Sequence, residues 1–169
     1  MHEDHKREQY FFDPPTRRWF ADILERYAHP CCLCAPMIAE ELHRRRKAVR
    51  VLDIDPRFSH LPGFQKWDLH RPEPLPERFD VIACDPPFTK VSLARLFTAL
   101  RVLCQGDLTT PILLCHLASR SADVCGTLAP FGLRPTDIEA GYVSVRPIEE
   151  NRVLVYSNFD LPTRPSPEP

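Results

Sequence analysis

The sequence predicts an α/β fold whose sheet is mostly parallel, carries helices on both faces and ends in an antiparallel hairpin. Short apolar runs of the kind that form fully buried parallel strands recur along the chain, the clearest at residues 79–84 and 111–116. Between them lie segments such as residues 91–104, where apolar side chains recur at helical spacing. The last part of the chain alternates polar and apolar residues, which is typical of antiparallel strands at a sheet edge.

The helices and strands can be placed in chain order. Apolar residues at helical spacing predict a first helix over residues 15–28, which Pro30 ends. A first strand over residues 31–34 follows, and Pro36 then takes the first-turn position that proline favours in a helix running to about residue 47. The remaining elements are expected as strands over residues 48–52, 63–67, 79–84 and 111–116, helices over residues 91–104 and 118–128, and an antiparallel pair over residues 137–145 and 151–159.

Length and composition fit one domain. The chain has 169 residues, of which 43% are hydrophobic, and this is enough for one core. We expect residues 14–160 to form the folded domain and the proline-rich residues 161–169 to be a disordered tail. The chain has no 18-residue apolar run, and its start is polar after Met1, which predicts a soluble, cytoplasmic protein.

The charge balance limits how the protein can hold a partner. The net charge of −1, from 22 Lys and Arg against 23 Asp and Glu, excludes a bulk electrostatic grip on nucleic acid but allows a local basic patch. Residues 44–47, Arg-Arg-Arg-Lys, end the second predicted helix. They are either a solvated helix end that complements the helix dipole or a patch that contacts phosphate.

The cysteines do not predict disulfides or a metal site. Their number is odd, at seven, and several lie in apolar runs, where a thiol behaves as a small hydrophobe. Cys31 and Cys34 form a C-x-x-C that could bind zinc or act in redox chemistry. Zinc would need a second ligand pair at matching spacing, and the sequence offers none, so no metal is expected.

The stretch Asp85-Pro86-Pro87-Phe88 carries the clearest chemistry, because it directly follows the strand at residues 79–84. In open α/β sheets ligands bind at such strand ends. The prolines restrict the backbone, so that the Asp85 carboxylate and the Pro86 carbonyl can lie on one side of a rigid loop. These two acceptors can face the two N–H bonds of a planar exocyclic amine such as that of adenine, and Phe88 can stack on a base. The amine nitrogen is then available to attack an electrophilic methyl group. A plain proline turn is the structural alternative.

Carboxylates follow two further strands. Asp53 and Asp55 come after residues 48–52, at the position where a doubly wound sheet binds the ribose of a nucleoside. We expect one of them to bind the ribose hydroxyls and the other to cap the next turn, and the sequence does not indicate which. Asp68 follows the third strand and is expected near the adenine ring of that nucleoside. His116, at the end of the fifth strand, is expected to be a satisfied structural histidine.

These elements and motifs together resemble a class I S-adenosylmethionine-dependent methyltransferase, and more narrowly the probable N6-adenine methyltransferase family. The resemblance covers about residues 9–159. It rests on Gln9-Tyr10-Phe11-Phe12 with Thr16, Cys34-Ala35-Pro36, Leu52-Asp53-Ile54-Asp55-Pro56-Arg57-Phe58, Trp67-Asp68, Asp85-Pro86-Pro87-Phe88 and residues 153–158. The family includes a ribosomal RNA adenine methyltransferase with CCHC zinc fingers and a lysine methyltransferase of a translation elongation factor.

The resemblance implies S-adenosylmethionine as the cofactor, and it implies a role for each motif. The turn Cys34-Ala35-Pro36 would approach the methionine part of the cofactor, and Asp85-Pro86-Pro87-Phe88 would be the catalytic loop. Asp53, with Asp55 beside it, would bind ribose, and Asp68 would lie near the adenine.

Residues 1–13 would fold over the site, with Gln9 and Tyr10 at the cofactor and Phe12 at the target. The chain departs from the family in two ways. It has Met37 where the elongation-factor branch usually has Ser, and it lacks the zinc-binding modules of the ribosomal RNA enzyme.

The leading functional prediction is methyl transfer to N6 of adenine in RNA, ribosomal RNA included, or in DNA. Phe88, with Tyr10 or Phe12, would sandwich an extruded base. Lys90, Arg71 or Arg120 would contact phosphates.

Two other functions stay open at this stage. The same motif serves a protein lysine in this family, so a lysine of a translation factor is an alternative acceptor, which the near-neutral charge slightly favours. A non-catalytic subunit that binds S-adenosylmethionine is the third, although the complete set of carboxylates at three strand ends argues against it. The sequence does not predict the oligomeric state.

Overall fold

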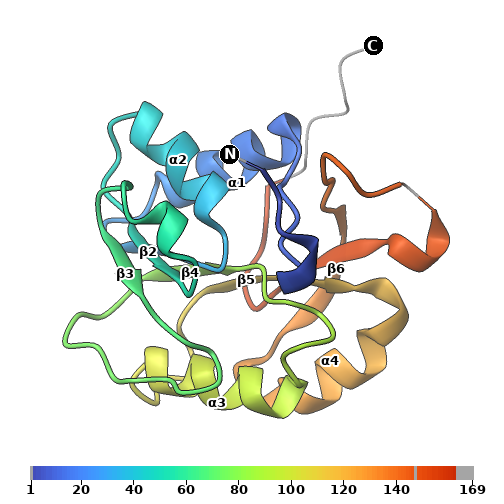
Figure 1. The fold of residues 1–169 in the computed structure, drawn as a ribbon. Helices are drawn as coiled ribbons and strands as arrows, with labels where there is room; N and C mark the ends of the chain where they lie inside the picture. The colour runs from blue at the N-terminus through green and yellow to red at the C-terminus, as the bar shows by residue number, and fades with distance from the viewer. Residues whose placement is uncertain (1, 147, 163–169) are drawn as a thin grey trace.

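The core of the protein is a seven-stranded sheet, seen in a computed structural model that describes residues 2–146 and 148–162 (Figure 1). The strand order is β3-β2-β1-β4-β5-β7-β6. The strands are β1 (Pro30–Leu33), β2 (Arg50–Asp53), β3 (Phe64–Lys66), β4 (Val81–Cys84), β5 (Ile112–Leu117), β6 (Arg134–Glu139) and β7 (Val153–Ser157). Strands β1 to β5 pair in parallel, and β7 lies antiparallel between β5 and β6. The predicted mixed sheet with an antiparallel C-terminal hairpin is therefore confirmed.

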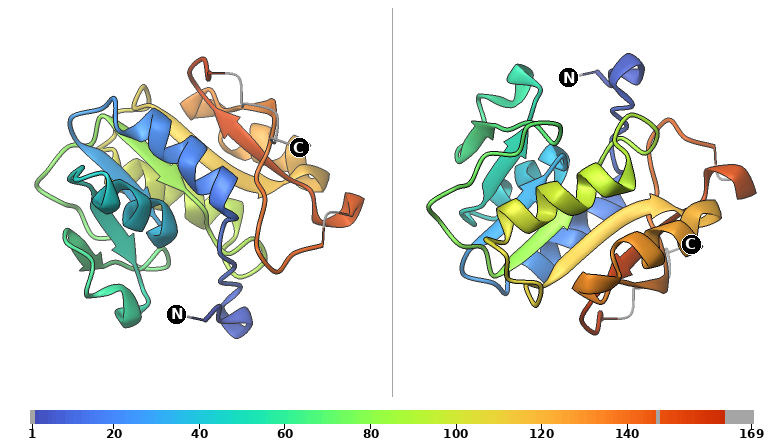
Figure 2. Two further views of the ribbon diagram at one scale, coloured as in Figure 1. Left: turned by 90° about the horizontal axis from the view of Figure 1, so that it is seen from above. Right: turned by 90° about the horizontal axis from the view of Figure 1, so that it is seen from below.

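Within the described residues, four α-helices cover the two faces of the sheet. Seen from above and below, α1 and α2 lie over one face and α3 and α4 over the other (Figure 2). The helices are α1 (Pro14–Leu24), α2 (Pro36–Arg44), α3 (Leu93–Leu103) and α4 (Ser121–Thr127), with 3-10 turns at His5–Arg7, Pro56–Phe58, Ala118–Arg120, Ala129–Phe131 and Glu149–Asn151. Two hydrophobic clusters follow from this, one under each pair of helices. None of the helices among the described residues is long and apolar enough to cross a membrane.

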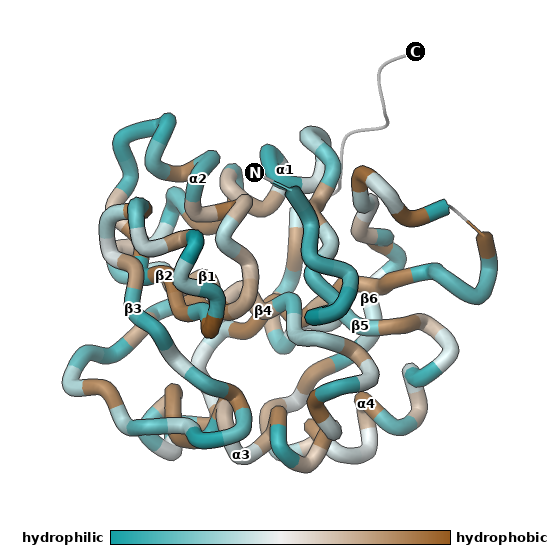
Figure 3. Tube along the Cα trace, viewed as in Figure 1, coloured by the Kyte–Doolittle hydropathy of each residue, from teal (hydrophilic) through white to brown (hydrophobic). Residues whose placement is uncertain are grey.

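Strands β1 and β4 form the centre of the sheet and are fully buried, as their continuous apolar sequence predicts. Hydrophobic residues concentrate in the strands, whereas the N-terminal segment is hydrophilic (Figure 3). The same parallel direction brings the carboxyl ends of β1, β2 and β4 to one edge of the sheet, since Leu33 pairs with both Leu52 and Cys84. The predicted site residues Cys34, Asp53 and Asp85 lie at this edge, at the ends of β1, β2 and β4.

Helix α1 ends four residues before the predicted boundary at residue 28. The α-helical bonds give way to tighter turn bonds, from the Arg26 N–H to Ile23 O at 3.2 Å and from the Tyr27 N–H to Leu24 O at 3.1 Å. Beyond this turn, the N–H groups of Ala28 and His29 donate to the Asp80 carboxylate at 2.8 and 2.9 Å. Asp80 thereby joins the end of α1 to the residue before β4.

Helix α2 ends at Arg44, before the predicted residue 47, because Arg46 adopts a left-handed backbone conformation with φ 60°. In the basic run, Arg45 is not a solvated helix end. Its guanidinium bonds Asp22 at 2.6 Å and Glu25 at 3.1 Å, both in or next to α1, and its Nε bonds Glu41 at 3.2 Å. Arg45 thus holds α1 and α2 together, and it is not free to contact phosphate.

Strand β6 occupies residues 134–139, and not the predicted 137–145. The alternating residues beyond it pair with a different partner, the N-terminal segment. The backbone of Phe12 bridges to Tyr142, and the Val143 N–H donates to the Phe11 carbonyl at 2.9 Å. The alternating pattern therefore predicted extended backbone correctly. It did not indicate that this backbone pairs first with β7 and then, beyond residue 139, with the N-terminal segment.

Candidate active site

The turns after β1, β2 and β4 meet at one place. The Cys34 N–H donates to Leu52 O of β2 at 2.8 Å, and the Asp85 N–H donates to Leu33 O of β1 at 3.1 Å. Cys34 has φ 54°, so the chain turns sharply between β1 and α2. Burial raises the pKa of the Cys34 thiol well above its usual range, and the nearby Asp53, Asp85 and Asp68 carboxylates add to this. The three carboxylates predicted from separate motifs therefore surround one turn.

Asp85 is the partly buried carboxylate directly after β4. Burial raises its pKa to about 8, and a hydrogen bond from Tyr142 opposes this rise. The Tyr142 hydroxyl donates to Asp85 Oδ1 at 2.7 Å. Removing a carboxylate from water disfavours its charged form unless donors replace the water, and here the side chain of Tyr142 is one such donor. A carboxyl with this pKa can gain or lose a proton near neutral pH.

Tyr142 was not among the residues predicted from the sequence, where it lay inside an expected strand. It reaches Asp85 because the segment after β6 pairs with the N-terminal segment. Asp13 N–H donates to Gly141 O at 2.9 Å, and the rings of Tyr142 and Phe12 stack with centroids 4.8 Å apart. Asp85 and Tyr142 are 57 residues apart, and no local pattern connects them.

At the end of β2, the structure gives Asp53 and Asp55 different environments. Asp53 is 6% exposed and accepts the Asp55 N–H at 2.8 Å, and burial raises its pKa to about 6. Asp55 is 1% exposed; burial alone would raise its pKa, but hydrogen bonds from Arg57 and Gln9 lower it to about 2. Asp55 also caps the following 3-10 turn by accepting the Arg57 N–H at 3.0 Å. The side chain of Asp55 is therefore used by its neighbours, which leaves Asp53 as the carboxylate suited to a ligand.

Asp68 follows β3 and is partly buried. Its carboxylate accepts the His70 N–H at 2.8 Å, and its carbonyl accepts the Arg71 N–H at 3.0 Å. It shapes the turn after the strand, and its charge contributes to the raised pKa of the Cys34 thiol.

The N-terminal segment crosses this site. Gln9 Nε2 donates to Asp55 Oδ2 at 3.0 Å, and Arg57 Nη2 donates to Gln9 Oε1 at 2.6 Å. Beneath the segment remains a cavity of about 30 Å³. It is lined by Glu8, Gln9, Tyr10, Phe11, Phe12, Cys34, Ala35, Pro36, Met37 and Asp85. The structure thus brings together the predicted residues 9–12, the turn at residues 34–36 and Asp85.

A second pocket, of about 310 Å³, opens on the other side of Tyr142. It is lined by Tyr10, Phe88, Leu117, Tyr142, Ser144, Val145, Arg146, Asn151 and Val153. Three of these side chains are aromatic, and Arg146 and Asn151 are polar. Phe88 also packs against the His116 ring, with centroids 5.1 Å apart. The pocket has the size and the apolar lining of a small-ligand site, and its lining residue Tyr142 donates the hydrogen bond to Asp85.

Phe12 does not line this pocket, in contrast to its predicted place at the target. Its ring is 2% exposed and packs against Phe20 and Tyr142, at 5.5 and 4.8 Å between centroids. In this structure the ring therefore packs on Tyr142 and is not exposed in the aromatic pocket.

His116 is 1% exposed, and its Nδ1 accepts the Leu117 N–H at 2.9 Å. Burial, together with the charge of Arg120, lowers its pKa to about 4. The ring is therefore neutral near pH 7, and its contacts are those of a structural histidine.

The predicted phosphate contacts have other partners in this structure. The Lys90 ammonium contacts the Lys6 carbonyl of the N-terminal segment. Arg120 pairs with Asp123 at 3.6 Å on α4. Arg71 is exposed on the turn that Asp68 shapes. These contacts do not join Lys90, Arg120 and Arg71 into one basic patch.

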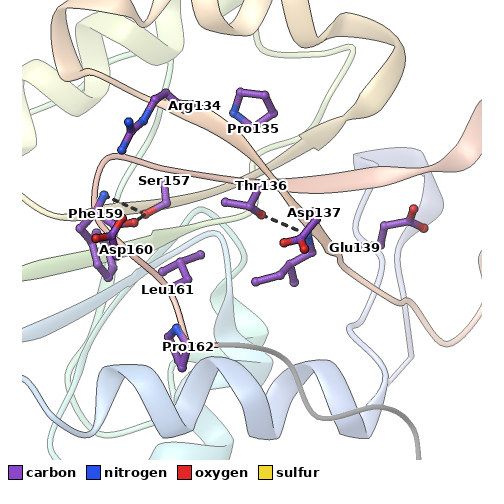
Figure 4. Close-up of a pocket in the computed structure, with 11 residues that line it drawn as sticks. Arg134, Pro135, Thr136, Asp137, Glu139, Ser157, Phe159, Asp160, Leu161 and Pro162 are labelled. Atoms are coloured by element: carbon purple, nitrogen blue, oxygen red, sulfur yellow. Dashed lines mark hydrogen bonds between the residues drawn. The ribbon is translucent and has the colours of Figure 1, made fainter.

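Another cavity, of about 650 Å³, lies away from this site, where β6 and the end of β7 face the segment that follows (Figure 4). Its lining includes Thr136, Asp137 and Leu161 but none of the predicted site residues. No group of three or more His, Cys, Asp or Glu residues within residues 2–146 and 148–162 is arranged to hold a metal ion. All seven cysteines are free thiols.

The fold agrees with solved structures of low sequence identity. A protein of Pyrococcus horikoshii described as a candidate RNA methyltransferase is 13% identical, with a TM-score of 0.60 over 92% of this chain and 88% of that chain. A TehB-like S-adenosylmethionine-dependent methyltransferase of Corynebacterium glutamicum is 15% identical, with a TM-score of 0.58 over 86% and 88% of the two chains. The N-methyltransferase NodS of Bradyrhizobium japonicum is 14% identical, with a TM-score of 0.54 over 86% and 96%. These likenesses show the fold.

The family assignment rests on the sequence. Comparison with curated proteins gives no match. Residues 3–161 match the family model described as "Probable N6-adenine methyltransferase", which is nearly the whole chain and includes every predicted site residue. The chain belongs to the Probable N6-adenine methyltransferase family and is a class I methyltransferase that uses S-adenosylmethionine.

Proposed function

We propose that the protein methylates N6 of adenine in a nucleic acid, RNA in the first place. The observation that carries the proposal is the Asp85-Pro86-Pro87-Phe88 loop at the end of β4. Its Asp85 carboxylate lines the cavity beneath the N-terminal segment and accepts a hydrogen bond from Tyr142, which lines the aromatic pocket together with Phe88. The family description and the description of the Pyrococcus protein support the same acceptor.

The residues at the strand ends fit S-adenosylmethionine. Asp53 is a buried carboxylate at the end of β2 with the place and chemistry to accept ribose hydroxyls, and Asp68 lies beside it for the adenine. The tight turn at Cys34 lets backbone groups approach the methionine part. The cofactor supplies a methyl group on a positively charged sulfur. A cavity of about 30 Å³ is too small for it, so residues 8–12 must move to admit it.

Asp85 has two roles toward the acceptor nitrogen. Its carboxylate, with the Pro86 carbonyl, accepts the two N–H bonds of the amine and fixes the direction of the nitrogen lone pair. When the nitrogen gains a methyl group it must lose one proton, and the carboxylate is beside it to receive that proton. A pKa raised to about 8 makes Asp85 a better proton acceptor than an ordinary aspartate. Tyr142 holds the carboxylate in place through its hydrogen bond.

The pocket beside Asp85 suits a planar base better than a flexible chain. Its aromatic side chains, Tyr10, Phe88 and Tyr142, offer π-faces, on which a base extruded from its stack can be held. Its volume of about 310 Å³ leaves room for a purine. Arg146 and Asn151 at the same pocket can reach the sugar or phosphate.

The test is transfer of a radiolabelled methyl group from S-adenosylmethionine to total RNA, DNA and protein, measured separately. The Asp85→Asn variant is the negative control. Asp137→Asn is the matched control for loss of a carboxylate, because Asp137 is exposed on β6 and lines the separate cavity of about 650 Å³, not the aromatic pocket or the cavity beneath the N-terminal segment. We expect label in RNA, recovered as N6-methyladenosine after digestion to nucleosides, with the wild type and Asp137→Asn alone. Label that appears only in protein and resists nuclease would overturn the adenine proposal in favour of lysine.

A further inference from the structure

The Glu8 carboxylate lies on the turn that directly follows the catalytic loop. The Thr89 N–H donates to Glu8 Oε2 at 3.0 Å and the Lys90 N–H donates to the same oxygen at 3.3 Å. The Thr89 hydroxyl donates to the other carboxylate oxygen. Three donors of two adjacent residues thus converge on one negatively charged group. These bonds and the charge of Lys90 hold the pKa of Glu8 below its usual range, although burial alone would raise it.

The backbone of Glu8 is fixed independently of this contact. Glu8 has φ 55° because it caps the 3-10 turn His5–Arg7, and its N–H donates to the His5 carbonyl at 3.1 Å. Elsewhere in the N-terminal segment, ordinary turn bonds and the Gln9 contact with Asp55 already hold the chain over the site. The bonds from Thr89 and Lys90 to the Glu8 carboxylate are therefore additional to those that hold the segment in place.

Successive backbone N–H groups with a hydroxyl and an ammonium nearby form an anion site. Carboxylate and phosphate present the same chemistry to such donors, namely negatively charged oxygen atoms that accept hydrogen bonds. Thr89 and Lys90 come immediately after Phe88, which lines the aromatic pocket. The anion site and the pocket for the base therefore belong to one loop.

We propose that the turn at Thr89 and Lys90 binds a backbone phosphate of the target nucleic acid, and that Glu8 occupies this site until the phosphate displaces it. The proposal rests on the proposed nucleic-acid acceptor. Displacement frees the Lys90 ammonium as well, because that group contacts the Lys6 carbonyl only while the N-terminal segment is in place. It also loosens residues 8–12, which cover the cofactor cavity. Glu8 thus couples arrival of the acceptor to opening of the site.

The first experiment measures binding of a five-nucleotide oligoadenylate by fluorescence anisotropy. If Glu8 competes for the site, the apparent affinity is the intrinsic affinity multiplied by the fraction of molecules in which the site is open. Glu8→Gln removes the competing charge and should tighten binding by about five-fold or more. Glu40→Gln, on α2 and outside the cavities described above, removes the same charge and should leave the affinity unchanged. Thr89→Val should weaken binding, and Lys90→Gln should reduce the salt dependence by about one counterion.

The second experiment uses inorganic phosphate and needs no nucleic acid. In the Glu8→Gln protein, phosphate should shift the amide NMR signals of Thr89 and Lys90, with a smaller shift at the same concentration in the wild type. Circular dichroism and thermal unfolding confirm that each variant is folded.

The outcomes separate this proposal from the proposed function. If the wild type methylates RNA but Glu8→Gln binds oligoadenylate no better than Glu40→Gln, the anion site is wrong and the function stands. If phosphate shifts both amide signals but no variant binds or methylates RNA, the assignment to a nucleic-acid phosphate fails together with the proposed acceptor.

Discussion

Asp55 and Asp85 are both carboxylates that follow buried parallel strands, yet the structure gives them opposite environments. Asp55 accepts bonds from Arg57, Gln9 and backbone, and its pKa is lowered to about 2. Asp85 has Tyr142 as its side-chain donor, and burial raises its pKa to about 8. The comparison shows that the hydrogen-bond donors around a strand-end carboxylate decide whether its role is structural or chemical. A carboxylate whose oxygens are bonded within the protein is stable, and one with few donors is available to a ligand.

The largest expected effect is that of Asp85→Asn on methyl transfer. The amide keeps the size of the side chain but donates where the amine must also donate, and it cannot take up the proton. We expect kcat to fall by about a thousand-fold, with S-adenosylhomocysteine binding within about three-fold of the wild type. Single-turnover transfer assays and calorimetry measure the two quantities.

The same variant should be more stable than the wild type. Because the folded pKa of Asp85 is raised, its protonated form stabilises the protein at acid pH, and this contribution is lost as the pH rises from about 4 through about 8. At pH 8 and above, Asp85→Asn should raise the free energy of unfolding by about 1 to 3 kcal/mol. A variant that is less stable at pH 8 would contradict the raised pKa.

Tyr142→Phe should have the second-largest effect. It removes the hydroxyl that holds the Asp85 carboxylate and keeps the ring that packs on Phe12. We expect kcat to fall by about 10- to 100-fold. The bond from Tyr142 lowers the pKa of Asp85, so its loss should also move the pH profile of kcat toward alkaline pH. An unchanged profile with reduced kcat would indicate a packing role only.

The fourth prediction compares the pH dependence of the affinities for S-adenosylmethionine and for its product, S-adenosylhomocysteine. A positive charge near Asp85 favours the ionised carboxylate, so binding of S-adenosylmethionine should release a proton below pH 8. Its affinity should therefore fall by up to about ten-fold for each pH unit between 8 and 6. S-adenosylhomocysteine lacks that charge, so its affinity should change less with pH. Titration of Asp53 affects the affinities of both ligands. The ratio of the two affinities, from calorimetry, isolates Asp85, and a ratio constant with pH would contradict the prediction.

Asp55→Asn should have the smallest effect on transfer and the opposite effect on stability. Because the folded pKa of Asp55 is lowered, its contribution is complete above about pH 4 and is lost as the pH falls through about 2. Loss of the charge weakens the bonds to Arg57, so we expect the free energy of unfolding at pH 7 to fall by about 2 kcal/mol. Thermal unfolding measures this. If Asp55→Asn lost transfer as fully as Asp85→Asn while remaining folded, the contrast between the two residues would be wrong.

Much of the fold could be predicted because its signals are local. The apolar runs at β1, β4 and β5 are as fully buried as their composition indicated, and proline marks the starts of α1 and α2. The Asp85-Pro86-Pro87-Phe88 loop follows its strand directly, so the strand's position also fixes the position of the loop. The course of the chain after α1 was less predictable, since the N–H groups of Ala28 and His29 donate to Asp80, which lies 52 and 51 residues away.

The sequence by itself determined the sheet, its carboxyl edge and the carboxylates that stand there, because strand formation and strand-end chemistry depend on neighbouring residues. Only the tertiary structure decided what each carboxylate does. Gln9 reaches Asp55 from 46 residues away, Tyr142 reaches Asp85 from 57, and Glu8 reaches Thr89 from 81. Hydrogen bonds and desolvation set the pKa of a buried acid, and both depend on segments that meet only when the chain is folded.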